Sequence, residues 1–366
     1  MIKFLDLHAQ YLSIKDEMDA AIAEVIATSA FIGGPAVRNF EASFGAWVGS
    51  PYCIGVGNGT DALEIALEAL ALPAGSEVIL PANSFIATSE AVGRSGLKVV
   101  FADVDQDTYV LDPESVRQLI TDRTSAIIPV HLYGHPCDMP ALMTIAREHN
   151  LKVIEDSAQA HGAVIDGQTV GTIGDFGTFS FYPGKNLGAY GDAGAITCGD
   201  EALARRARMI ANHGRVAKYD HEFEGRNSRL DGLQAAILST KLPHLDGWIE
   251  RRIAVADRYA DRLSGIPGLT LPHRGNRARH AYHLYVVRTA QRDALANHLK
   301  ARGIETGVHY PVALPRLAAY ASHPQAQVDF FAARMGAEVL SLPIGEHLDM
   351  DQVDEVCSAV RDFFAS

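Results

Sequence analysis

The chain has 366 residues, of which 48% are hydrophobic and 21% are charged, and a net charge of −12 at pH 7. This length suits two domains of a globular protein, no apolar stretch is long enough to span a bilayer, and the acidic charge argues against a nucleic-acid partner. The N-terminus does not resemble a signal peptide, and four scattered cysteines without a C-x-x-C pair predict neither disulfides nor a zinc site, so we expect a cytoplasmic location.

Apolar residues at near-helical spacing predict helices over residues 1–50, with a break at 31–35. From Cys53 onward short apolar strands alternate with helices. Strands are expected at 53–56, 78–80, 99–101, 126–130 and 153–154, and helices at 60–70, 84–95, 113–120 and 139–149. This alternation predicts an α/β fold with a mostly parallel central sheet covered by helices on both faces. Such sheets bind ligands beyond the carboxyl ends of their strands.

The second half of the chain predicts a helix to about Ala211, a polar basic loop at 213–229, and a long helical segment at 233–263 that contains Pro243. A linker rich in Gly, Pro and Arg follows at 264–279. Beyond it we expect strands at 282–287 and 305–310, and helices at 292–302, near Phe330 and near Val353. We assign residues 1–245 to a large domain and 246–366 to a smaller C-terminal α+β domain, on which the N-terminal helix can also pack.

The stretch from Thr178 to Gly194 holds one lysine, Lys185, in an otherwise uncharged run that closes with Asp192. Aromatic residues flank it. Desolvation lowers a lysine pKa, so that the neutral amine becomes available near pH 7, as a Schiff-base lysine requires. The alternative is an exposed loop lysine whose stem lies on aromatic rings.

A glycine-rich turn, Gly55–Asp61, lies between a predicted strand and a predicted helix. Free N–H groups at a helix start attract phosphate, and glycines let the backbone approach it. The alternative is a tight turn in which Asn58 or Thr60 caps the helix. Both interpretations can hold at once.

Asp156 follows a predicted buried strand, where a carboxylate needs a partner. A protonated pyridine nitrogen is one such partner, and Gln159 is placed to donate to a neighbouring oxygen. The alternative is a helix N-cap at Asp156 or Ser157. We expect His161 to pack in the interior.

The basic loop at 213–229 concentrates cations in an acidic protein: Arg215, Lys218, Arg226 and Arg229. Arginine binds phosphate in a bidentate manner. For most of these residues a solvated loop with internal ion pairs to Asp220, Glu222 and Glu224 is the favoured interpretation. No metal site is predicted, because Gly134 and Pro136 prevent His131 and His135 from sharing a helix face.

The motifs GNGTDAL, PANSFIATSEA, VIEDSAQAHGA, SFYPGKNLGAYGDAGA and NSRLDGLQAAIL follow one another in this order. With them the chain strongly resembles, over nearly its whole length, the nucleotide-sugar aminotransferases of the DegT/StrS type. These are pyridoxal-phosphate (PLP) enzymes of fold type I, the aspartate-aminotransferase fold. The resemblance implies PLP as cofactor and a homodimer with active sites at the subunit interface.

The resemblance also implies roles for single residues. Lys185 matches the lysine that forms the Schiff base and shuttles the proton, and Asp156 matches the aspartate that keeps the pyridine nitrogen protonated. Gln159 matches the residue near the phenolic oxygen, and Phe85 falls where an aromatic ring covers one face of the cofactor. Gly59, Thr60 and Ser180 match residues that bind the cofactor phosphate, and Asn227 matches an asparagine that reaches the phosphate of the partner subunit's cofactor. The positions that match residues near the sugar nucleotide are Arg229, His309 and Tyr310.

The run NLGAYGDAGA after the lysine resembles family members that aminate a 3-keto sugar. Members that act on a 4-keto sugar tend to carry a threonine-rich, glutamate-containing run there. The stretch KYDHEFEGRNSRLDGLQAAILSTKLPHL points the same way. The implied reaction moves an amino group from L-glutamate to a 3-keto hexose carried on dTDP or UDP. A 4-keto acceptor and a PLP-binding regulator without turnover are the alternatives.

Overall fold

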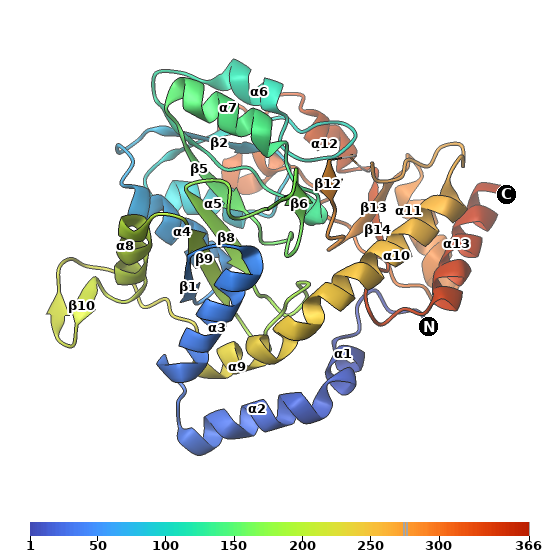
Figure 1. Cartoon of the computed structure of the whole chain (residues 1–366). Coiled ribbons are helices and arrows are strands. Elements are labelled where there is room, and N and C mark those ends of the chain that lie inside the picture. The colour runs from blue at the N-terminus through green and yellow to red at the C-terminus, as the bar shows by residue number, and fades with distance from the viewer. Residues whose placement is uncertain (274, 276, 366) are drawn as a thin grey trace.

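The computed structural model describes residues 1–273, 275 and 277–365, and its centre is a seven-stranded sheet in the order β1-β9-β8-β5-β4-β2-β3 (Figure 1). Strands β8, β5, β4, β2 and β3 are parallel, whereas β9 is antiparallel to both β8 and β1. The predicted, mostly parallel α/β sheet is therefore confirmed. The strands are β1 (Tyr52–Val56), β2 (Glu77–Pro81), β3 (Lys98–Ala102), β4 (Thr124–Ile127), β5 (Lys152–Asp156), β8 (Phe176–Ser180) and β9 (Gly194–Cys198).

Helices cover both faces of this sheet, as its apolar strands require. Helices α4 (Gly59–Leu70) and α8 (Glu201–Ala211) pack on one face, and α3 (Gly34–Val48) and α9 (Gly232–Lys241) pack on the other. On the second face the rings of Phe44 and Phe179 meet edge to face at 5.1 Å. Helices α5 (Ala87–Arg94), α6 (Pro113–Leu119) and α7 (Met139–His149) follow β2, β3 and β4.

Several of these helices begin at a residue suited to that place. The side chains of Asn58, Asp112 and Asp138 accept first-turn N–H groups of α4, α6 and α7. In α6 and α7 a proline also occupies the first turn, where its missing N–H costs nothing. These local signals explain why the helix starts could be predicted from the sequence.

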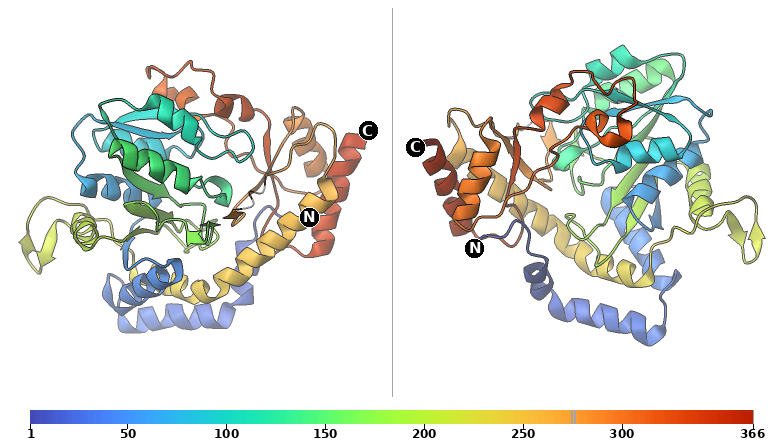
Figure 2. Two further views of the ribbon diagram at one scale, coloured as in Figure 1. Left: turned by 45° about the horizontal axis from the view of Figure 1, so that its top comes forward. Right: turned by 180° about the vertical axis from the view of Figure 1, so that it is seen from behind.

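A smaller unit lies at the far end of helix α10 (Leu245–Leu263), which runs from α9 toward it (Figure 2). There β13 (Tyr285–Arg288) and β14 (Val339–Leu342) pair antiparallel and pack with α10, α11 (Arg292–Ala301) and α13 (Met350–Ala365) around a separate apolar cluster. Residues near α12 (Phe331–Met335) belong instead to the core of the large sheet. The division at 245/246 therefore stays a prediction.

The predicted strand at 305–310 is wrong, because this segment makes only a single bridge, from Gly307 to Ser341. His309 and Tyr310 line a pocket instead of extending the sheet. The long helical segment is split at Pro243, which lacks an N–H group, by a 3₁₀ turn, η2 (Leu242–His244). Within the predicted linker, residues 274 and 276 lie outside the described residues, and β12 (Ala278–Arg279) pairs with β6 (Val164–Ile165), which pairs with β7 (Gln168–Thr169).

The N-terminal helices α1 (Leu7–Ser13) and α2 (Lys15–Thr28) lie below the sheet in Figure 1. Ile14 and Met18 pack on Ile237 of α9. A short hairpin of β10 (Arg215–Ala217) and β11 (Asp220–His221) projects from the body of the molecule. Among the described residues, no helix combines the length and the apolar character that a membrane crossing requires.

Candidate active site

A pocket of about 900 Å³ opens at the carboxyl ends of β2, β4 and β5, the edge where parallel sheets bind ligands. It brings together most of the predicted site residues, from both halves of the chain. Two of them, Asn227 and Arg229, do not line it. Those that line it are Gly59, Thr60, Phe85, Asp156, Gln159, Ser180, Lys185, His309 and Tyr310.

Lys185 lies in the loop between β8 and β9, and its side chain is half-buried in the pocket wall. Two backbone hydrogen bonds close the base of this loop, from Phe181 N to Ala193 O at 2.8 Å and from Ala189 N to Phe181 O at 2.7 Å. Burial lowers the pKa of the Lys185 amine to about 8, against the opposing charge of Asp156. Among the described residues no hydrogen bond or ion pair engages this amine, so it is accessible to an electrophile in the pocket.

Asp156 is the last residue of β5 and only 5% exposed. The hydroxyl of Thr88 donates to its carboxylate at 2.8 Å, and the N–H of Ala158 does so at 3.2 Å. Burial raises the pKa of the Asp156 carboxyl, while these hydrogen bonds and the charge of Lys185 oppose the rise. No helix begins at Asp156 or Ser157, so the alternative of a helix cap is wrong.

Gln159 is held from two sides. Its Oε1 accepts the backbone N–H of Tyr133 at 2.7 Å, and its Nε2 donates to the hydroxyl of Tyr310 at 3.0 Å. The first contact fixes which end of the amide carries the N–H groups, so one N–H remains free for a ligand. The hydroxyl of Tyr133 in turn donates to the carbonyl of His309.

The start of α4 forms one end of the pocket. Asn58 caps the helix by accepting the N–H of Asp61 at 2.8 Å, which leaves the N–H groups of Gly59 and Thr60 outside the intrahelical bonds. A Cβ at Gly59 would lie 2.7 Å from the Cβ of Ser180, so only glycine permits this close approach. The interpretation as a helix cap is therefore confirmed for Asn58, and phosphate binding at this turn stays a prediction.

The segment 226–229 lies beside this turn, and its successive side chains make different contacts. Arg226 pairs with Glu64 and Glu68 of α4. Ser228 donates to Asp61 at 2.6 Å and accepts the N–H of Gly57 at 3.0 Å. Asn227 between them is exposed and does not line this pocket.

The rest of the basic loop differs from the expectation of internal ion pairs. Glu222 pairs with Arg205 of α8 at 3.3 Å, and the cations of the loop make no ion pair with Asp220 or Glu224 in the described part of the chain. Arg229 lies 3.5 Å from the side-chain oxygen of Asn212. His309 and Tyr310, which the resemblance assigns to the sugar nucleotide, do line the pocket.

Three residues of the site were not predicted from the sequence: Thr88, Tyr133 and His283. Tyr133 follows a strand end, and that position is the signal that could have identified it. Burial holds the pKa of His283 well below its ordinary value and that of His309 at about 4, so both imidazoles are neutral. His161 packs between Phe179 and Phe181, as expected.

These residues fit pyridoxal phosphate: an amine for its aldehyde, a buried carboxylate for its ring nitrogen, and a glycine turn at a helix start for its phosphate. Fold and site together define a PLP-dependent aminotransferase of the α/β type.

Comparison with known proteins gives the family. Residues 12–361 match the model of the DegT/DnrJ/EryC1/StrS aminotransferase family, and the chain belongs to this family. It is 46% identical, over 99% of its length and 96% of the relative's, to the dTDP-3-amino-3,4,6-trideoxy-alpha-D-glucose transaminase of Streptomyces venezuelae. It is 41% identical to the UDP-N-acetyl-3-dehydro-alpha-D-glucosamine 3-aminotransferase of Acidithiobacillus ferrooxidans, over 98% of this chain and 97% of that one.

A solved structure agrees. The crystal structure of S. venezuelae DesV in complex with a ketimine intermediate superposes with a TM-score of 0.97 at 46% identity, over 100% of this chain and 99% of that one. The predicted family, fold and cofactor are thereby confirmed.

Proposed function

We propose that the protein transfers an amino group from L-glutamate to carbon 3 of a keto hexose linked to dTDP or UDP, in amino-sugar biosynthesis. The placement of Lys185 and Asp156 in one pocket carries the proposal for the reaction. The acceptor is supported by four relatives at 41–46% identity, whose names specify amination at carbon 3 of dTDP- or UDP-linked sugars. Two others in this range carry regulatory names, which is why the regulator stays the alternative.

When bound, the cofactor supplies an electron sink that permits a proton to leave the carbon bearing the amino group. Lys185 would hold the cofactor, and its Nζ would carry this proton, for which an amine with a pKa of about 8 is suited. The carboxylate of Asp156 would keep a proton on the ring nitrogen. The remaining N–H of Gln159 would donate to the phenolic oxygen.

The remaining residues bind and orient. Gly59, Thr60 and Ser180 would hold the phosphate, and Phe85 would cover one face of the ring. In this proposal His309 and Tyr310 approach the sugar. Arg229, which does not line this pocket, is assigned to the sugar nucleotide by resemblance alone. The three arginines of the pocket wall are already paired, Arg94 and Arg226 with Glu64 and Arg252 with Glu346, so further cations for a diphosphate have to come from elsewhere.

We infer that a second subunit supplies the further groups that bind the substrate and the cofactor. The exposed Asn227 does not line the pocket of its own chain, and in our proposal it reaches the cofactor phosphate of the partner in a homodimer with shared active sites. All four cysteines are free and buried, which suits the reducing cytoplasm that we propose as the location of the protein.

The experiment that tests this function is a half-reaction. The protein is converted to its aminated-cofactor form with L-glutamate, freed of glutamate, and offered a panel of 3-keto and 4-keto nucleotide sugars. We expect a 3-keto sugar to yield an amino sugar, seen by mass spectrometry, and to restore the visible absorption of the cofactor. Turnover of 4-keto sugars alone would reject the acceptor, and no turnover of any sugar would favour the regulator without catalysis.

A further inference from the structure

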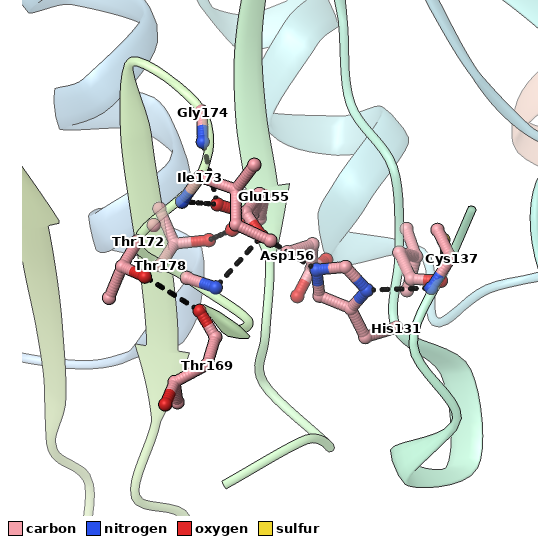
Figure 3. Close-up of polar contacts among 12 residues, drawn as sticks. His131, Cys137, Glu155, Asp156, Thr169, Thr172, Ile173, Gly174 and Thr178 are labelled. Carbon is pink, nitrogen blue, oxygen red and sulfur yellow. Dashed lines mark hydrogen bonds and ion pairs between the residues drawn. The ribbon is translucent and has the colours of Figure 1, made fainter. Parts of the chain in front are cut away.

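Glu155 is a fully buried carboxylate directly before Asp156 on β5, with 0% of its surface exposed. Successive side chains of a strand point to opposite faces, so Glu155 lies behind Asp156 and outside the pocket. Four N–H groups donate to it (Figure 3): those of Ile173 at 2.7 Å and Gly174 at 2.8 Å to Oε1, and those of Gly171 at 2.8 Å and His131 Nε2 at 3.0 Å to Oε2.

His131, also fully buried, extends this contact. Its Nδ1 lies 3.0 Å from the backbone N of Cys137, which donates to it. The ring proton therefore sits on Nε2, where it points at Glu155, and a neutral imidazole is sufficient. The backbone N–H of His131 donates in addition to the carbonyl of Asp156 at 3.0 Å.

The chain segments joined at Glu155 are those that carry the candidate site. Strand β5 carries Asp156. The loop 171–174 leads into β8, which ends at Ser180, and the chain then continues to Lys185. The segment 131–137 contains Tyr133, whose N–H fixes Gln159.

A carboxylate buried in this way is weak support for stability, because its desolvation offsets much of what its hydrogen bonds contribute. We propose that Glu155 and His131 are positioning residues, which hold the strand of Asp156 and the loop of Lys185 in a fixed relation across the back of the site. This inference rests on the proposed function, in which Lys185 and Asp156 act on the cofactor.

The test uses the pKa of the Lys185 amine to detect a change in its position relative to Asp156. The charge of Asp156 supports the protonated form of Lys185, and the other titratable groups near this amine, His161, His283 and His309, are kept neutral by burial. If Asp156 moves away, the pKa of Lys185 falls. The pH dependence of chemical labelling at Lys185, followed by mass spectrometry on cofactor-free protein, measures this pKa.

We expect Glu155→Gln and His131→Leu each to lower the labelling pKa of Lys185 by about one unit. His131→Gln keeps an N–H donor toward Glu155, so it should lower the pKa less. The matched control is Asp103→Asn, because Asp103 accepts the backbone N–H groups of Phe331 and Ala332, at 2.6 and 3.0 Å, away from the pocket. This variant should lose stability and leave the labelling pKa unchanged.

An unchanged labelling pKa in folded Glu155→Gln and His131→Leu proteins would overturn the proposal and leave the pair a purely structural one. If Glu155→Gln does not fold, the two His131 variants decide. The cofactor is absent from this measurement, so its result is separate from the half-reaction, and either proposal can fail alone.

Discussion

The amine of Lys185 is held at a pKa of about 8 by burial, whereas in the unfolded chain it has an ordinary value near 10.5. Between these two values the unfolded state binds more protons than the folded state. The free energy of unfolding of the cofactor-free protein therefore rises with pH across this window. Below about pH 8 both states are protonated, and the folded state bears the full cost of the buried ammonium.

Replacing this lysine should accordingly stabilise the cofactor-free protein. Lys185→Met keeps the length of the side chain and removes the charge, so we expect the free energy of unfolding at pH 7 to increase by about 1–3 kcal/mol. The increase should shrink as the pH rises from 8 to 10. Denaturant unfolding at a series of pH values measures it, with the exposed Lys300→Met as control. An unchanged value for Lys185→Met would contradict the buried charge.

Single residues were predictable where the signal is local. The helix cap at Asn58 needs only its own turn. The motifs of Lys185 and Asp156 each left an alternative open when taken alone, and it was their combination with the glycine turn and Ser180 that predicted one site. Tyr133 was not predictable in this way, because its contact with Gln159 depends on how two strand ends meet. Asn227 and Arg229 lie outside the pocket of their own chain, so their assignments stay predictions.

At the scale of elements, the loop between β8 and β9 sets the position of Lys185. A Cβ at Gly188 would lie 2.2 Å from the carbonyl oxygen of Pro183, on the other side of Lys185 in the same loop. Lys241 of α9 adds to this by donating to the carbonyl of Gly188 at 2.7 Å. The loop thus has room for only one backbone path.

Gly188→Ala should force this path to shift. We expect a loss of about 1–3 kcal/mol in the free energy of unfolding and a weaker retention of cofactor, because the steric conflict is with backbone and cannot relax by a rotamer change. The molar ratio of cofactor to protein after gel filtration measures the second effect. Gly199→Ala is the control, since a Cβ there meets nothing within 4 Å. Equal behaviour of the two variants would refute the argument.

The strands on either side of this loop, β8 and β9, were not predicted. Each is short. Strand β9 is defined by its antiparallel pairing with β1, which lies far from it in the sequence, and with β8, which lies across the loop. The reverse error occurred at 305–310, where β-branched and aromatic residues suggested a strand. There the chain turns toward the pocket, and His309 bonds through Nδ1 to the hydroxyl of Ser341 at 2.8 Å.

At the scale of the whole molecule, the proposed homodimer makes a prediction about mixed dimers. Lys185→Ala and Asn227→Ala should each be inactive or impaired alone. In a heterodimer of the two, one site combines the intact Lys185 of one subunit with the intact Asn227 of the other. A statistical mixture should then regain about a quarter of the wild-type activity.

Lys185→Ala mixed with Asp156→Asn is the control, because both of these residues belong to the same pocket and no mixed dimer has an intact site. Activity is assayed after refolding the mixture together, with the heterodimer content checked by native mass spectrometry. No gain in verified heterodimers of the first pair would show that Asn227 does not act across subunits.

The antiparallel pairing of β1 with β9 also has a consequence for synthesis on the ribosome. Tyr52 pairs with Cys198, so the strand before the phosphate turn is made long before the strand that it joins. At ordinary translation rates this edge waits on the order of ten seconds or more, with its backbone groups unpaired. Chaperone capture of the nascent chain should therefore concentrate on lengths between these two strands, and a pause in translation there would prolong the exposure.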